Sequence, residues 1–101
     1  VEELAREGVL VVCAAGNRGH EENHQVIAPA SAPSALTVGG WNDGNRPGMH
    51  RARPYHSSYG PTIDGLAKPD LLAPAIWIAA PILPRTVSHE LALFLEELDR
   101  L

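Results

Sequence analysis

The feature that most constrains this chain is an apolar run near its N-terminus that ends in a glycine and an asparagine. Residues Val9 to Ala15 read Val-Leu-Val-Val-Cys-Ala-Ala, and Gly16-Asn17 follow directly. A short continuous run rich in β-branched residues is typical of a strand buried on both faces of a parallel sheet. The polar residues after it leave from the carboxyl end of that strand, which is where open α/β sheets build their sites.

The neighbouring segments favour the same class. Val1 to Gly8 predicts the last turns of a helix, with Gly8 at the C-cap position that suits a positive φ. Ala35 to Gly40 predicts a second strand, and Pro29 and Pro33 exclude a helix between the two strands. A helix, a glycine and a buried strand in this order indicate an α/β protein with a parallel sheet.

The second half of the chain is richer in turn residues. Trp41 to Pro54 predicts a loop, while 70–74 and 76–79 predict two short strands. The last segment predicts an amphipathic helix that starts after Ser88 as N-cap. Its apolar stripe, which would need a partner, consists of Leu91, Leu95 and Leu98.

Length and charge exclude several classes of function. With 101 residues the chain is one small domain or part of one, and its net charge of −4 argues against a nucleic-acid partner. No apolar run reaches the roughly 18 residues that a membrane-spanning helix needs, so no membrane partner is expected. The single cysteine, Cys13, predicts a buried and inert thiol rather than a disulfide.

Three motifs in order resemble the subtilisin-like serine peptidases. Val11 to Asn17 resembles the family strand that ends in Ala-Ala-Gly-Asn, and 28–39 resembles its Pro-Ala segment followed by a strand ending in Val-Gly. Residues 57–61, Ser-Ser-Tyr-Gly-Pro, and 68–74, Lys-Pro-Asp-Leu-Leu-Ala-Pro, resemble the pair of motifs that follows in that family. Where the family continues with glycine this chain has Ala75, which requires that φ there is not positive.

The resemblance implies a part of a doubly wound parallel sheet that carries a C-terminal amphipathic helix. Residues 1–80 would be a partial catalytic domain and 81–101 an insertion or tail. In this family the catalytic Asp and His precede the Ala-Ala-Gly-Asn strand, and the catalytic Ser follows in a Gly-Thr-Ser motif that is absent here. The chain alone is therefore expected to be inactive, with the remainder of its own domain as partner and a polypeptide as substrate of the intact enzyme.

The resemblance also assigns site residues. Asn17 would be the oxyanion-hole donor, and Ala14, Ala15, Gly16 and Pro29 would shape the substrate pocket, with a cis peptide bond before Pro29. The alternatives are that Asn17 caps a turn, that Pro29 is an ordinary turn proline, and that the small residues reflect tight packing; the complete Ala14 to Asn17 motif favours the functional role of Asn17. No cofactor is expected; the family's calcium sites suggest Asp43 or Asp64 as ligands, but no ligand-dense spacing supports a metal here.

Two other functions remain as alternatives. One is a catalytically inert, subtilase-derived binding module that uses the Leu91, Leu95 and Leu98 stripe to dock a partner. The other is a nucleotide-binding α/β unit, which ranks far behind because no glycine-rich phosphate loop follows the strand at 9–15. His20 and His24, four residues apart, are expected to be solvated loop residues rather than metal ligands.

Overall fold

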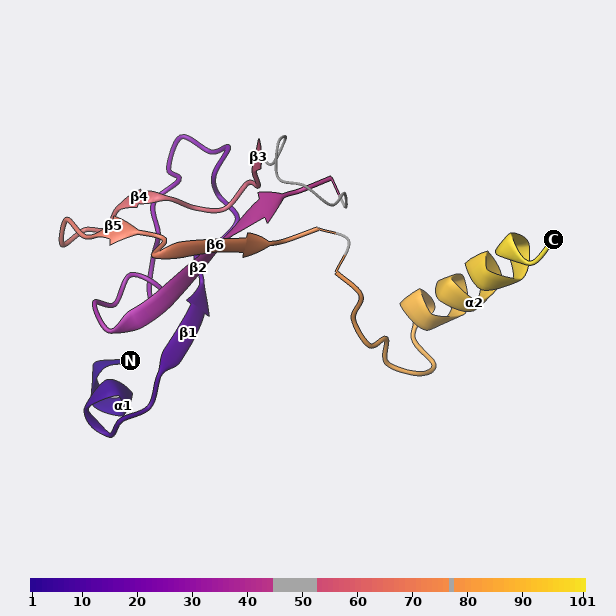
Figure 1. Cartoon of the computed structure of the whole chain (residues 1–101), viewed down its shortest axis with the longest axis horizontal. Helices are drawn as coiled ribbons and strands as arrows, with labels where there is room; N and C mark the ends of the chain where they lie inside the picture. The colour runs from indigo at the N-terminus through magenta and orange to yellow at the C-terminus, as the bar shows by residue number, and fades with distance from the viewer. Residues whose placement is uncertain (45–52, 77) are drawn as a thin grey trace.

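A computed structural model of the chain describes residues 1–44, 53–76 and 78–101. Its elements, in chain order, are α1 (Glu2–Arg6), β1 (Val11–Ala14), β2 (Ala35–Asn42), β3 (Arg53–Pro54), β4 (Gly60–Pro61), β5 (Ala67–Lys68), β6 (Leu71–Pro74) and α2 (Val87–Asp99). Figure 1 shows the strands gathered around β2, with α2 at the far end of an extended segment. The parallel strands and the C-terminal helix confirm the predicted incomplete α/β domain.

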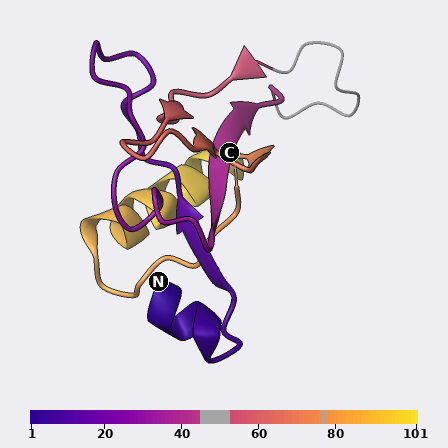
Figure 2. The same ribbon diagram turned by 90° about the vertical axis from the view of Figure 1, so that its left-hand side faces the viewer.

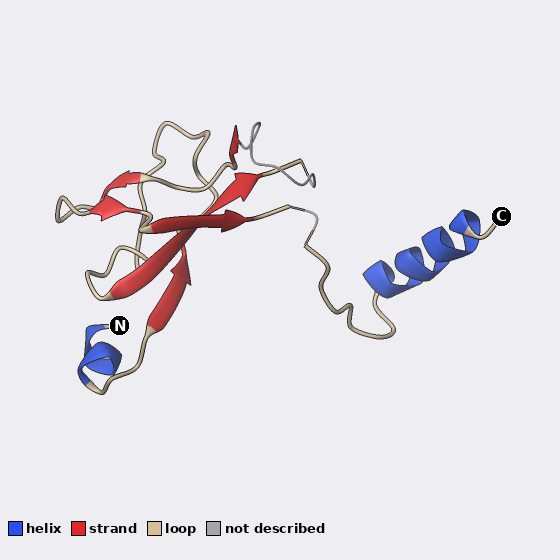
Figure 3. Cartoon of the chain, viewed as in Figure 1, coloured by secondary structure: helices blue, strands red, loops and turns tan. Residues whose placement is uncertain are grey.

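Strand β2 is the centre of the sheet because it pairs with three other strands. It runs parallel to β1 along its first half and parallel to β6 along its second half, and its last two residues pair antiparallel with β3. The secondary-structure view shows β2 passing between β1 and β6 (Figure 3). Strands β4 and β5 form a separate two-stranded antiparallel ribbon.

The backbone of β2 uses both of its edges. The carbonyl groups of Val38 and Gly40 accept hydrogen bonds from the amides of Ala15 and Tyr55 on one edge. The carbonyl groups of Thr37 and Trp41 accept from Asp70 and Ala75 on the other edge. Because successive carbonyls of a strand point in opposite directions, β2 holds two separate parts of the chain at once.

The prediction that the first strand is buried on both faces is wrong. Strand β1 covers only Val11–Ala14, and Leu10 and Val12 are 70% and 59% exposed. The reason is that β1 pairs only with β2, so no described element covers its outer edge or one of its faces. Alternate residues do point inward: Cys13 packs against the cluster of Ala15, Val26 and Ala30.

Several local predictions are confirmed and others are corrected. Gly8 has φ +78 after α1, and 27–34 forms turns without a helix. The predicted loop 41–54 is wrong at both ends, since β2 continues to Asn42 and pairs with β3, while 45–52 lies outside the described residues. In the predicted strand 76–79, Ile76, Ile78 and Ala79 are not in a strand, and residue 77 lies outside the described residues.

The C-terminal helix forms as predicted, with a different cap. Thr86, not Ser88, is the N-cap, because its Oγ1 accepts the hydrogen bond from the His89 amide at 3.2 Å. In the view turned by 90°, α2 lies behind the strands and overlaps them in projection (Figure 2). None of its residues is buried, and its exposed apolar residues include Leu91, Leu95 and Leu98. Neither described helix is long and apolar enough to cross a membrane.

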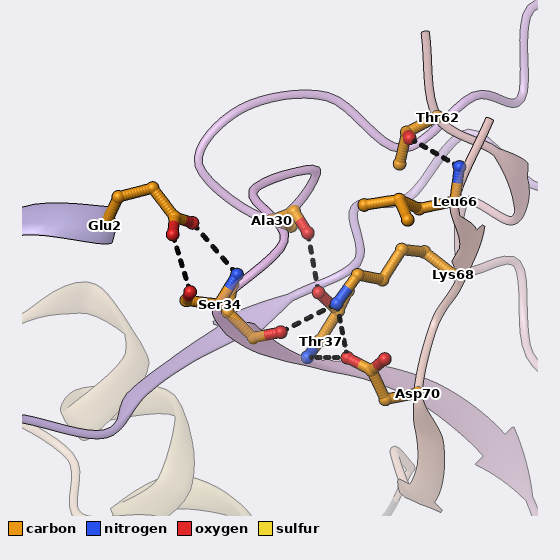
Figure 4. A network of polar contacts seen from close by, with 9 residues as sticks. Glu2, Ala30, Ser34, Thr37, Thr62, Leu66, Lys68 and Asp70 are labelled. Atoms are coloured by element: carbon orange, nitrogen blue, oxygen red, sulfur yellow. Dashed lines mark hydrogen bonds and ion pairs between the residues drawn. The ribbon is translucent and has the colours of Figure 1, made fainter. Parts of the chain in front are cut away.

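A network of polar contacts around the buried Lys68 joins the turn at Ala30, strand β2 and residues 68–70 (Figure 4). The Nζ atom of Lys68 lies 2.7 Å from the Ala35 carbonyl oxygen and 2.7 Å from Oδ2 of Asp70, and its side chain is only 4% exposed. The same Oδ2 accepts a hydrogen bond of 2.7 Å from the Thr37 amide, and Thr37 Oγ1 donates to the Ala30 carbonyl. A buried ammonium group is tolerated here because both of its contacts are oxygen acceptors, one of them charged.

The pKa of Asp70 reflects this arrangement. The hydrogen bond from Lys68, followed by that from the Thr37 amide, lowers the pKa of Asp70 below its ordinary value of 3.8 against an opposing effect of desolvation. A carboxyl group whose pKa is lower in the folded state stabilises the fold in its ionised form. Its contribution is complete above the ordinary pKa and is lost as the pH falls through the lower, folded-state pKa.

We expect Asp70→Asn to lower the free energy of unfolding and to reduce the part of that energy that is lost in acid. The substitution removes the charge facing Lys68 and leaves a buried ammonium group without its anion. Urea unfolding between neutral and acidic pH measures both effects, in a polypeptide that contains the whole chain. The matched control is Glu96→Gln, which removes the exposed ion pair with Arg100 and should change stability little. Equal effects of the two substitutions would contradict the prediction.

Candidate functional site

The carboxyl ends of the three parallel strands meet around one open depression. Its volume is about 440 Å³, and its lining includes residues that end or follow β1, lie within β2, and end or follow β6. Those that bear on the chemistry are Ala14, Ala15, Gly16, Asn17, Gly39, Gly40, Tyr55, Ser57 and Ala75. A concave space of this size is in the range that binds small molecules or single side chains.

Four of the five residues assigned from the sequence border this depression, and the fifth does not. Asn17 is exposed, and its side chain makes no hydrogen bond with any other described residue. Ala14 and Gly16 are also exposed, whereas Ala15 directs its side chain into the small core. Pro29 is exposed in the turn before β2 and is not part of the lining, and the Ala28–Pro29 peptide bond is cis, as the resemblance implies.

The loop that carries Asn17 is held by residues 56–58. The Ser58 amide donates to the Gly16 carbonyl at 2.8 Å, Ser58 Oγ accepts from the Arg18 amide at 3.1 Å, and the Gly19 amide donates to the His56 carbonyl at 2.8 Å. Ser57 makes a comparable contact with β2, since its Oγ accepts the Gly40 amide at 2.6 Å. The side-chain contacts of these two serines join residues 17 and 40 positions apart and leave no local signal in the sequence.

Two glycines allow this close packing. Gly16 has φ +106, and a Cβ atom there would lie 2.8 Å from Ser58 Oγ. At Gly40 a Cβ atom would lie 2.5 Å from the Cβ of Ala75, so the chain after β6 passes close to β2. Ala75 has no positive φ, because among the described residues the positive-φ residue other than glycine is Arg85. The replacement of glycine by alanine at this position is therefore compatible with the backbone.

The described residues contain no assembled nucleophile and base. Across 1–44, 53–76 and 78–101, no serine hydroxyl is hydrogen-bonded to a histidine ring. His24 stacks on Tyr59 at 4.0 Å between ring centroids, and its Nδ1 contacts the Tyr59 carbonyl oxygen. No group of three or more His, Cys, Asp or Glu side chains within those ranges could hold a metal ion.

Comparison with known proteins shows to which family the chain belongs. The model of the subtilase family matches residues 1–90. The chain belongs to the subtilase family. The match extends through β6 and into the first turn of α2, and therefore includes every strand of the sheet.

Two curated relatives agree with this assignment. The chain is 40% identical over 89 residues to alkaline protease 1 of Aspergillus clavatus, which covers 87% of the chain and 20% of that protein. It is 36% identical over 77 residues to serine protease AprX of Bacillus subtilis, covering 75% of the chain and 17% of that protein. The chain thus spans about a fifth of the length of these relatives. No solved structure matches the chain.

We expect Gly16→Ala to destabilise the subtilase fold more than Gly8→Ala. Both glycines have a positive φ, which costs a substituted residue of order 1–3 kcal/mol. Only Gly16 would also place its methyl group against another residue, Ser58, while a Cβ at Gly8 meets nothing within 4 Å. Urea unfolding measures both variants: Gly8→Ala reports the backbone strain alone, and Gly16→Ala reports the strain together with the contact to Ser58. Equal losses in the free energy of unfolding would show that the Ser58 contact is not close.

Proposed function

We propose that this chain supplies the oxyanion-hole donor and part of the substrate pocket of a subtilisin-like serine endopeptidase. The observation that carries the proposal is the position of Asn17: an exposed carboxamide on a tightly held loop, at the carboxyl end of a parallel strand and at the edge of an open depression. The relatives, one named an alkaline protease and the other a serine protease, support the same reaction class.

The chemistry needs a donor of this kind. When a serine hydroxyl attacks a peptide carbonyl, the carbon becomes tetrahedral and negative charge develops on the carbonyl oxygen. An amide N–H fixed at the position of that oxygen stabilises the charge more than it stabilises the neutral substrate. The Nδ2 group of Asn17 is the donor in this proposal, and because it makes no hydrogen bond to another described residue it is available to the substrate.

The small residues before Asn17 complete the proposal. Ala14 and Gly16 border the depression without filling it, which leaves space for a substrate side chain beside the scissile bond. Pro29, on the turn before β2, belongs to the same pocket only through the family resemblance. The nucleophilic serine and its histidine and aspartate would come from the remainder of the catalytic domain, so the substrate is a polypeptide bound between this chain and that remainder.

Asn17→Ala is expected to lower kcat for a peptide substrate with little change in KM, because the donor acts on charge that exists only in the transition state. The fall should be roughly 10²- to 10³-fold, the magnitude already known for the corresponding asparagine of subtilisin. The measurement uses a polypeptide that contains this chain within a full catalytic domain, with hydrolysis of a chromogenic peptide as readout.

Two controls make this experiment decisive. Labelling by a serine-directed fluorophosphonate tests whether the domain has an activated serine, and Asn23→Ala removes an exposed loop carboxamide outside the depression. Labelling, a large fall for Asn17→Ala and none for Asn23→Ala would support the peptidase. A folded domain that is not labelled would contradict it and favour the inert binding module, for which the exposed leucine stripe of α2 is the docking surface.

A further inference from the structure

The loop that carries Asn17 is fixed from outside its own segment. Its backbone makes three hydrogen bonds to residues 56–58, one of them to the Ser58 side chain. They involve Gly16, Arg18 and Gly19, which are all the residues of 16–19 except Asn17 itself. The constraint therefore acts on both sides of Asn17, whose carboxamide makes no hydrogen bond to another described residue. An exposed side chain on a free loop would sample many positions, whereas here the backbone that carries it is held in place.

Ser58 makes two of these three contacts. Its amide donates to the carbonyl of the residue before Asn17, and its hydroxyl accepts from the amide of the residue after Asn17. Ser58 is buried, with only 2% of the residue exposed, so its own amide and hydroxyl are shielded from competing water. The missing side chain at Gly16 is what allows this approach, because a Cβ there would lie 2.8 Å from Ser58 Oγ.

We propose that Ser58 is a positioning residue that sets the location of the Asn17 carboxamide through the backbone on either side of it. This inference rests on the proposed function, because Ser58 can affect catalysis only if Asn17 does. An oxyanion-hole donor contributes through preorganisation, so small displacements reduce transition-state stabilisation while substrate binding elsewhere continues. Ser58 itself does not contact the reacting atoms.

The first test is Ser58→Ala in the full catalytic domain. Removing the hydroxyl releases the Arg18 amide and should lower kcat roughly 10- to 100-fold with KM nearly unchanged. The matched control is Thr62→Val. Thr62 is also buried, at 3% exposed, and its Oγ1 also accepts a backbone amide, that of Leu66, but it lies in the β4–β5 ribbon. Thr62→Val should leave kcat unchanged even where it lowers stability by a similar amount.

A double-mutant cycle with Asn17→Ala separates positioning from a general loss of structure. If Ser58 acts through Asn17, Ser58→Ala should lower kcat no further once Asn17 is alanine. If the losses in kcat of the two single variants multiply in the double variant, the positioning role is overturned and the proposed function stands. A normal kcat for Ser58→Ala together with a low kcat for Asn17→Ala would have the same meaning. A normal kcat for Asn17→Ala would overturn the proposed function and the positioning role together.

A second variant covers the case in which Ser58→Ala does not fold. Ser58→Cys fills the buried space with a thiol, which is a much weaker acceptor than a hydroxyl. Ser58→Cys should lower kcat by less than the roughly 10- to 100-fold expected for removal of the hydroxyl, with KM nearly unchanged. Wild-type kcat in a folded Ser58→Cys protein would overturn the inference.

Discussion

The structure depends on one strand that is hydrogen-bonded along both edges. Strand β2 holds β1 and β3 on one side and β6 on the other, with carbonyls alternating between the two. Since β1, β2 and β6 are parallel, their carboxyl ends lie at one edge, and the residues that follow them border a common depression. The candidate site therefore arises from strand direction and register before any particular side chain is considered.

Polar contacts fix the strands and loops around this sheet more than apolar packing does. The buried apolar residues are few and small, and the buried set also includes Thr37, Ser58, Thr62 and Lys68. Each of these four makes a specific hydrogen bond to the backbone of another position. Such bonds are directional, so they define where loops lie more narrowly than contacts among alanines and valines would. The same polarity accounts for the acid sensitivity expected from Asp70.

Features encoded locally were predicted from the sequence, and features that depend on distant partners were not. The helix end at Gly8, the strand in Ala35–Asn42 and the strand in Leu71–Pro74 follow from local patterns and were found. The exposure of Val12 was not predicted, because an apolar run indicates a strand but not how many other strands or helices cover that strand. Asn17 was proposed from a motif, whereas the supporting role of Ser58 required knowing that residues 40 apart are in contact.

The close approach of Gly40 and Ala75 makes the two positions interdependent in evolution. The methyl group of Ala75 occupies the space that a side chain at position 40 would need, so one position can gain volume only while the other remains small. Ala75 thus restricts which residues position 40 can accept. Which substitutions a lineage accepts along this edge of the sheet depends on the order in which they arise.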